Sequence, residues 1–159
     1  MPSDFSPQEI LKIAIRVEEN GKNLYQSLEN KAKKDELKAL WRYLKEQEKI
    51  HRQTFQEMLD NIKDYIIYEF NPGEYQAYLR AIASEYIFTQ ELVERKIKEG
   101  FDSDSEALKF GIFIEKESIL TYTALKEYIT TDKQSVLDKI IDEEKWHLVK
   151  LSALKDSFK

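Results

Sequence analysis

This chain of 159 residues contains no cysteine, only four glycines and three prolines, and only two histidines. The absence of cysteine excludes disulfides and thiolate-bound iron. Few glycines and prolines favour long helices, because these two residues interrupt helices most strongly. No apolar run approaches the roughly 20 residues that a membrane-spanning helix requires. The absences together predict an all-α protein without a membrane partner.

The charge pattern is equally restrictive. The chain carries a net charge of −5, with acidic and basic residues mixed along its length. Such mixing argues against nucleic-acid binding, which needs a concentrated basic surface. The first residues lack the apolar core of a signal peptide, so we expect a cytoplasmic protein. Its length suits a single domain spanning residues 1–159.

The two histidines occur in the same short frame, and this is the most informative feature that the sequence does have. Glu48 precedes His51 by three residues, and Glu144 precedes His147 by three. On a helix, residues three apart project from one face, so a carboxylate and an imidazole can reach one metal ion together.

Both pairs fall on apolar helix faces. The first face consists of Leu37, Trp41, Leu44, Phe55, Met58 and Ile62, and the second of Leu137, Ile140, Leu151, Leu154 and Phe158. A buried carboxylate without a partner costs several kcal/mol or more, in order of magnitude. For one pair alone, a neutral core histidine and a Glu bound to a Lys or Arg would be the simpler interpretation. Two pairs in matching places favour metal ligands.

Bundles that hold two metal ions use two Glu-x-x-His pairs and two further carboxylates. In the first helix Glu18 shares the apolar face, whereas Glu19 lies among polar residues. In the later helix, periodicity alone leaves Glu115 and Glu117 both open.

An internal repeat resolves that choice. Residues 14–28 align with residues 111–125 at an offset of 97, which matches Glu18 to Glu115, Gly21 to Ser118 and Tyr25 to Tyr122. The two Glu-x-x-His frames are separated by 96 residues, so the chain consists of two related helix pairs. Antiparallel pairing about residue 33 brings Glu18 and Glu48 to one level, roughly 22 Å from the turn.

Tyr25 and Tyr122 lie two turns after Glu18 and Glu115, respectively. Each phenol is a candidate to hold a ligand carboxylate in position. The alternative is an aromatic core residue whose hydroxyl bonds any nearby acceptor. Gly21 and Ser118 are small where ions and carboxylates need room.

Boundary signals predict where the helices start. Ser6, Ser103 and Thr131 precede or begin helical segments, and Asn71-Pro72-Gly73 interrupts the chain. A further helical segment over residues 74–99, ended by Gly100, has no counterpart in the repeat. It must return the chain from the second helix to the next one. Its apolar residues suit either a cap on the bundle or a dimer contact.

These motifs resemble the ferritin-like superfamily, and most of all its rubrerythrin-like branch of di-iron carboxylate proteins. The resemblance covers about residues 6–155. It implies a four-helix bundle of two antiparallel helix pairs joined by a long crossover, here with an additional helical segment. It also implies a two-metal centre that reacts with O2 or peroxide. The implied metal ligands are Glu18, Glu48, His51, Glu115, Glu144 and His147.

The chain departs from the best-known members because it has no cysteine for a rubredoxin iron. For the site of four carboxylates and two imidazoles we expect two Fe ions, with Mn as a possible native metal and Zn as an adventitious occupant. Expected partners are O2 or peroxide, an external electron donor such as a small redox protein, and a second copy in a homodimer. Two alternatives stay open: an iron-storage or ferroxidase subunit, and a metal-binding bundle without turnover.

Overall fold

The computed structural model describes residues 7–61, 74–127, 129 and 131–158. These residues form five helices: α1 (Pro7–Lys31), α2 (Asp35–Asp60), α3 (Glu74–Glu99), α4 (Asp104–Lys126) and α5 (Thr131–Ser157). No strand occurs within these ranges, so the all-α prediction is confirmed. The predicted Ser6 cap and the break at residues 71–73 lie outside the described residues.

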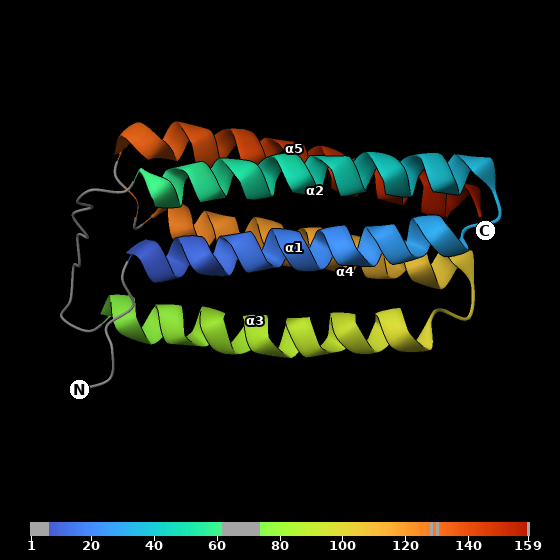
Figure 1. Ribbon diagram of the computed structural model, residues 1–159, viewed down its shortest axis with the longest axis horizontal. Helices are drawn as coiled ribbons and strands as arrows, with labels where there is room; N and C mark the ends of the chain where they lie inside the picture. The colour runs from blue at the N-terminus through green and yellow to red at the C-terminus, as the bar shows by residue number, and fades with distance from the viewer. Residues whose placement is uncertain (1–6, 62–73, 128, 130, 159) are drawn as a thin grey trace.

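Two antiparallel hairpins build the bundle. Helix α1 pairs with α2, and α4 pairs with α5. Figure 1 shows three layers, with α2 and α5 in one, α1 and α4 in the next, and α3 beneath them. Helix α3 runs the length of the bundle and returns the chain to the start of α4, which is the predicted crossover.

Helix α3 lies along the side of the bundle instead of capping its end. Its Val93 is 1% exposed and is buried in a hydrophobic cluster that includes Leu24 of α1 and Leu108 of α4. The Asn20 amide of α1 donates a hydrogen bond to the Tyr86 hydroxyl of α3 at 3.3 Å. At the far end, the Lys31 ammonium donates to the Ile97 carbonyl at 3.1 Å. The segment is therefore part of the packed structure.

The ends of α3 and α4 follow local sequence chemistry. Gly100 adopts a φ of 77°, a left-handed conformation that glycine tolerates and other residues rarely adopt. Three residues later, the Ser103 hydroxyl accepts a hydrogen bond from the Glu106 amide and caps α4. Both features match the boundaries predicted from the sequence.

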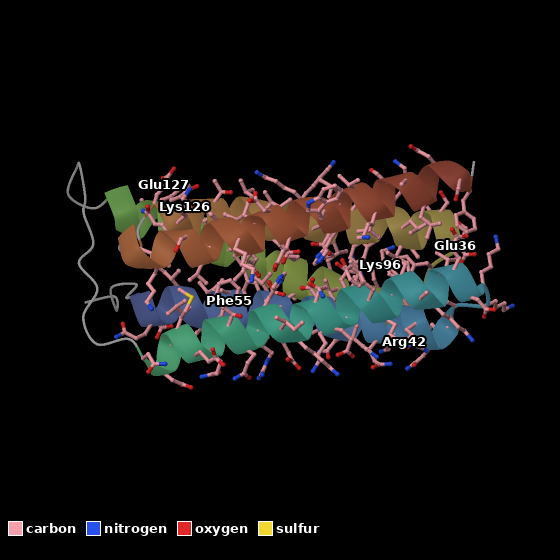
Figure 2. All side chains as sticks on the ribbon, turned by 90° about the horizontal axis from the view of Figure 1, so that it is seen from above. Glu36, Arg42, Phe55, Lys96, Lys126 and Glu127 are labelled. Carbon is pink, nitrogen blue, oxygen red and sulfur yellow. The ribbon has the colours of Figure 1, made fainter. Side chains whose placement is uncertain are left out.

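The hydrophobic core is divided by a polar layer. One cluster, around Ile10, Phe55 and Leu137, occupies one end of the bundle, and another, around Leu24, Trp41 and Leu151, occupies the other. Between them lie the buried carboxylates and imidazoles. Many side chains on the outside of the bundle end in nitrogen or oxygen atoms (Figure 2). No described helix combines the length and apolarity needed to cross a bilayer.

Candidate metal centre

The structure brings all six predicted ligand side chains into this polar layer. Each of the six residues has at most 2% of its surface exposed: Glu18, Glu48, His51, Glu115, Glu144 and His147. Helices α1 and α4 each contribute one Glu, and α2 and α5 each contribute a Glu-x-x-His pair. Glu117, the alternative left open by periodicity, lies outside the cluster.

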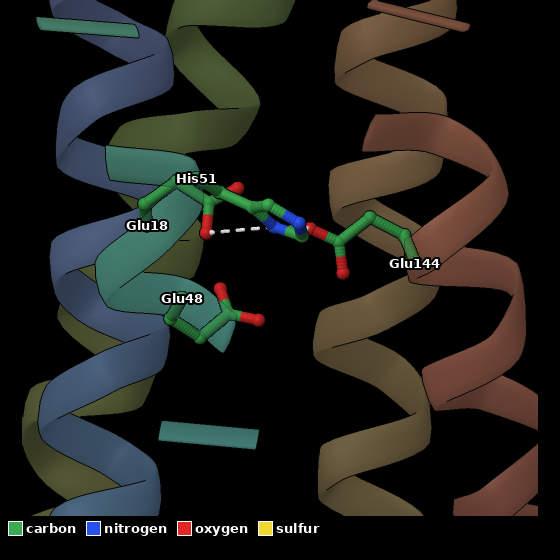
Figure 3. Close-up of side chains that lie close together, drawn as sticks. All are labelled: Glu18, Glu48, His51 and Glu144. Carbon is green, nitrogen blue, oxygen red and sulfur yellow. Dashed lines mark hydrogen bonds and ion pairs between the residues drawn. The ribbon is translucent and has the colours of Figure 1, made fainter. Parts of the chain in front are cut away.

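The cluster contains two overlapping groups. Glu18 and His51 belong to one group, Glu115 and His147 to the other, and Glu48 and Glu144 to both. Within each group the potential ligand atoms all lie within 4.8 Å of one another. Figure 3 shows the first group, with Glu144 reaching across from α5 toward Glu18 and His51. This arrangement provides two adjacent metal positions that share two carboxylates.

Both imidazoles present Nδ1 to the centre of the cluster. His51 Nδ1 lies 3.0 Å from Glu144 Oε1 and 3.7 Å from Glu18 Oε2. His147 Nδ1 lies 3.0 Å from Glu144 Oε2 and 3.5 Å from Glu115 Oε1. Glu144 therefore contacts both histidines, one through each oxygen, as a carboxylate shared between two positions would.

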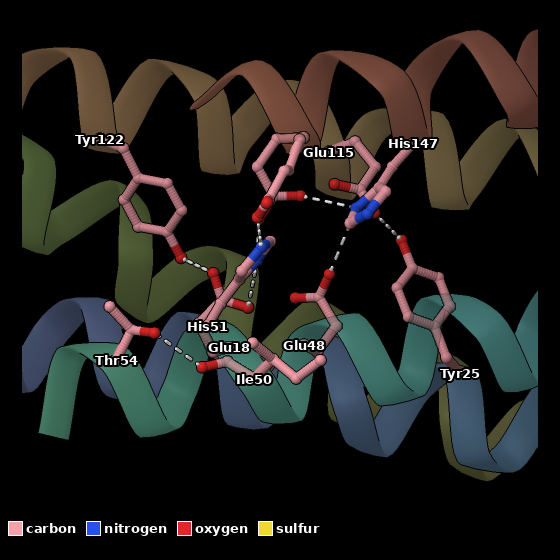
Figure 4. Close-up of polar contacts among 11 residues, drawn as sticks. Glu18, Tyr25, Glu48, Ile50, His51, Thr54, Glu115, Tyr122 and His147 are labelled. Atoms are coloured by element: carbon pink, nitrogen blue, oxygen red, sulfur yellow. Dashed lines mark hydrogen bonds and ion pairs between the residues drawn. The ribbon is translucent and has the colours of Figure 1, made fainter. Parts of the chain in front are cut away.

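The two buried tyrosines bind carboxylates of the opposite hairpin. The Tyr25 hydroxyl donates to Glu115 Oε1 at 2.7 Å, and the Tyr122 hydroxyl donates to Glu18 Oε1 (Figure 4). Burial, followed by the charge of these neighbouring carboxylates, raises the pKa of both phenols. Both therefore remain hydrogen-bond donors at neutral pH. The sequence placed them near the site but could not show that they cross the bundle.

Glu143 is a contact that the sequence analysis missed. Its Oε2 lies 2.6 Å from His51 Nε2, on the side of the ring away from the cluster. Such a partner fixes the orientation and tautomer of a metal-ligating histidine. Its position next to Glu144 was visible in the sequence, but only the packing of α5 against α2 reveals its target.

The two histidines differ in this respect. His147 Nε2 is buried and has no hydrogen-bond partner among the described residues. The His147 ring instead contacts the ring of Tyr43 in an edge-to-face arrangement, with the two ring centroids 5.9 Å apart. The two halves of the centre are thus related by the repeat but are not equivalent.

Crowding of carboxylates perturbs their ionisation. Burial and the charge of Glu144 raise the pKa of Glu115 to about 8, and burial and the same charge raise that of Glu48 well above its usual value. Burial acts to raise the pKa of Glu144 as well, but hydrogen bonds from Glu115 and both histidines hold it below its usual value. Glu144 therefore stays ionised at neutral pH.

The same carboxylates raise the pKa of both histidines. Burial lowers the pKa of each imidazole, but hydrogen bonds to the carboxylates outweigh burial. The pKa of His51 rises to about 11 and that of His147 to about 9. Without a metal ion, protons supply the positive charge that the carboxylates require.

The residues fit a pair of divalent cations. Glu18 Oε2 and Glu48 Oε1 are buried and find no hydrogen-bond partner in the part of the chain that the structure describes, although such atoms are nearly always satisfied in folded proteins. Four carboxylates would balance the charge of two divalent ions, and carboxylate oxygen with imidazole nitrogen suits iron, manganese or zinc. The unsatisfied oxygens are explained if the site holds cations.

Gly21 supplies the room for this arrangement. A Cβ built at this position would lie 2.8 Å from Glu48 Oε2, closer than a real Cβ contact. The glycine therefore lets Glu48 approach α1 from α2. Ser118 occupies the repeat-related position in α4 and is 2% exposed.

Fold and site together define a helical-bundle protein with a buried carboxylate and imidazole centre for two metal ions. The chain belongs to the rubrerythrin family, whose model matches residues 9–155. It is similar to a solved structure described as a ferritin-like diiron-carboxylate protein from Thermotoga maritima, with 30% identity, a TM-score of 0.68 and 98% of each chain covered. A comparison with curated proteins gives no match. The predicted family and ferritin-like fold are confirmed.

Proposed function

We propose that this chain binds two iron ions between its six buried ligands and uses them as an oxidase or peroxidase, with O2 or peroxide as the oxidant. The single observation that supports this most strongly is the pair of overlapping ligand groups sharing Glu48 and Glu144. In this proposal Glu18 and His51 complete one metal position, and Glu115 and His147 complete the other.

Iron would supply electrons to the oxidant, while the protein supplies geometry and exclusion of water. Tyr25 and Tyr122 hold Glu115 and Glu18 in place through their hydroxyl groups. Glu143 orients the His51 ring through Nε2. The protons that the histidines and Glu115 hold without metal would be released when cations enter.

The proposed activity requires an external electron donor. The chain has no cysteine and hence no second, thiolate-bound iron that could supply electrons. A small redox protein is the proposed donor.

The test is anaerobic loading with two equivalents of Fe(II), followed by rapid mixing with O2 or hydrogen peroxide. We expect a new near-ultraviolet absorption and consumption of oxidant in proportion to bound iron. The double variant Glu48→Ala/Glu144→Ala should react no faster than free Fe(II). The matched control is Glu46→Ala/Asp142→Ala, which removes exposed acids two residues away on the same helices.

Two results would redirect the proposal. Stoichiometric iron without any oxidant consumption would favour a metal-binding bundle without turnover. Uptake of many irons per chain by a large assembly in sedimentation would favour a storage subunit instead.

A further inference from the structure

A small cavity lies between α1, α3 and α4, outside the cluster of six ligands. Its volume is about 50 Å³, enough for a few atoms only. Helix α3 forms one wall, so the cavity exists because the crossover segment packs along the bundle.

The cavity lies at the level of the metal ligands along α1 and α4, although none of the six ligands lines it. Val17 directly precedes Glu18, Ile114 directly precedes Glu115, and Ser118 follows Glu115 by one turn, and all three line the cavity. Ile114 and Ser118 are buried, with 5% and 2% exposed. Leu120, which also lines the cavity, is 56% exposed, so the cavity has an outer end beside Leu120 and a buried inner end beside Ile114 and Ser118.

Several amide and hydroxyl groups of the wall already form hydrogen bonds within the protein. Asn20 donates to Tyr86, Thr89 donates to the Glu85 carbonyl at 2.9 Å, and Thr121 donates to the Glu117 carbonyl at 2.8 Å. The carboxylates of Glu85, which is exposed, and Glu117, which is half-buried, also line the cavity. At the buried inner end, Val93 and Ile114 are aliphatic, and Ser118 carries the hydroxyl. Hydrogen peroxide would give up hydrogen bonds to water on entry, whereas an uncharged diatomic gas would give up none.

We propose that this cavity binds dioxygen beside the metal centre. The inference rests on the proposed function, because it selects O2 over peroxide as the molecule held next to the ligands. Size excludes larger substrates, and the aliphatic inner wall favours an apolar occupant.

The direct test uses the full-length, metal-free protein, in which no oxidant can be consumed. O2 is paramagnetic, so dissolved O2 increases the relaxation of methyl protons that it approaches. We expect the methyl groups of Val93 and Ile114 to relax several-fold faster under O2 than under N2. Leu44 and Leu151 are buried to a similar extent but do not line the cavity, so their methyl groups should change little.

A cavity-filling variant tests the location. Thr89→Phe places a large side chain in the cavity from α3, far in sequence from every proposed ligand. It should remove the O2 effect on Ile114, whereas Gln90→Phe, beside it on the same helix but outside the lining, should not. Equal relaxation of cavity and core methyl groups in the unmodified protein would overturn the proposal.

Iron-loaded protein then tests the selection of oxidant. Thr89→Phe should slow the reaction with O2 several-fold at low oxygen and leave the peroxide reaction and iron content unchanged. An unchanged O2 rate would overturn the role of the cavity in delivery. If unmodified iron-loaded protein consumes neither O2 nor peroxide, the proposed function fails, while the methyl relaxation still decides whether the cavity binds O2.

Discussion

At the scale of single residues, the site depends on a few side chains that hold ligands without being ligands. Gly21 makes room for Glu48, and Tyr25 and Tyr122 position carboxylates on the opposite hairpin. Their substitution should separate metal binding from folding, because none of them contributes a carboxylate or imidazole.

Gly21→Ala should weaken metal binding but stabilise the metal-free protein. The added Cβ displaces the Glu48 carboxylate, which is the flexible end of its side chain. Because Glu48 belongs to both ligand groups, we expect at least tenfold weaker binding of the two metal ions. The metal-free helix should gain about 0.5–1 kcal/mol, the usual advantage of Ala over Gly within a helix. Chemical unfolding and metal titration measure the two effects.

Gly111→Ala is the matched control. Its Cβ would meet Leu151 Cδ2 at 3.1 Å and no ligand, so metal binding should be unchanged. Equal metal affinity in Gly21→Ala and the unmodified protein would show that Glu48 does not need its observed position.

Tyr25→Phe removes one hydroxyl and keeps the ring. The ring stacks on Trp41 with centroids 5.7 Å apart, so packing should persist. Glu115 loses the donor that orients it, and we expect metal affinity to fall by about 10–100-fold. Isothermal titration with Fe(II) or Mn(II) measures the change, with the exposed Tyr43→Phe as control. Unchanged affinity would mean that Tyr25 only fills the core.

At the scale of helices, the start of α4 matters because α4 carries Glu115 and Tyr122. Ser103 is its cap, through the hydrogen bond from the Glu106 amide at 3.1 Å. Ser103→Ala should lower the free energy of unfolding of the metal-free protein by about 1 kcal/mol. Ser105→Ala, in the same first turn but without a capping bond, should have a much smaller effect in urea unfolding. Equal losses would argue against capping as the cause.

The sequence predicted the helices from periodicity, and the six clustered residues from periodicity together with the internal repeat. Glu18 and Glu115 were identified by face and repeat, and the segment 74–99 by Gly100 and its composition. Periodicity shows which face of a helix is inward, but not which residue it meets across the bundle. The crossed Tyr25–Glu115 bond and the Glu143–His51 contact therefore required the structure.

The packing of α3 was unpredictable for a related reason. It has no counterpart in the repeat, so no symmetry indicated where it would lie. Its apolar residues fit an end cap, a dimer contact or a side layer equally well. Only the tertiary structure shows that it lies along the bundle and encloses the cavity with α1 and α4.

At the scale of the whole molecule, the polar layer across the core should make stability depend on pH and metal. In the folded protein the pKa of Glu115 rises from 4.5 to about 8, and those of His51 and His147 rise from 6.5 to about 11 and 9. A raised pKa contributes stability that is complete below the unfolded value and is lost as pH rises through the folded value.

The metal-free protein should therefore become less stable between about pH 5 and pH 11, as first Glu115, then His147 and last His51 lose their protons. Glu144, whose pKa is lowered, opposes this trend only in the acidic range below its usual 4.5. Metal ions compete with the same protons, so the stabilisation by metal should grow over the same interval. Thermal unfolding with chelator and with Mn(II) measures both. Rising stability with pH in chelator would contradict the role assigned to these groups.

The most direct measurement is the metal content of untagged protein after anaerobic loading and removal of free ions. We predict close to two irons per chain in the unmodified protein and fewer than one in Glu48→Ala/Glu144→Ala, with helical circular dichroism retained. No stoichiometric metal in the unmodified protein under any loading condition would contradict the two-metal centre, and the six buried side chains would then have a structural role only.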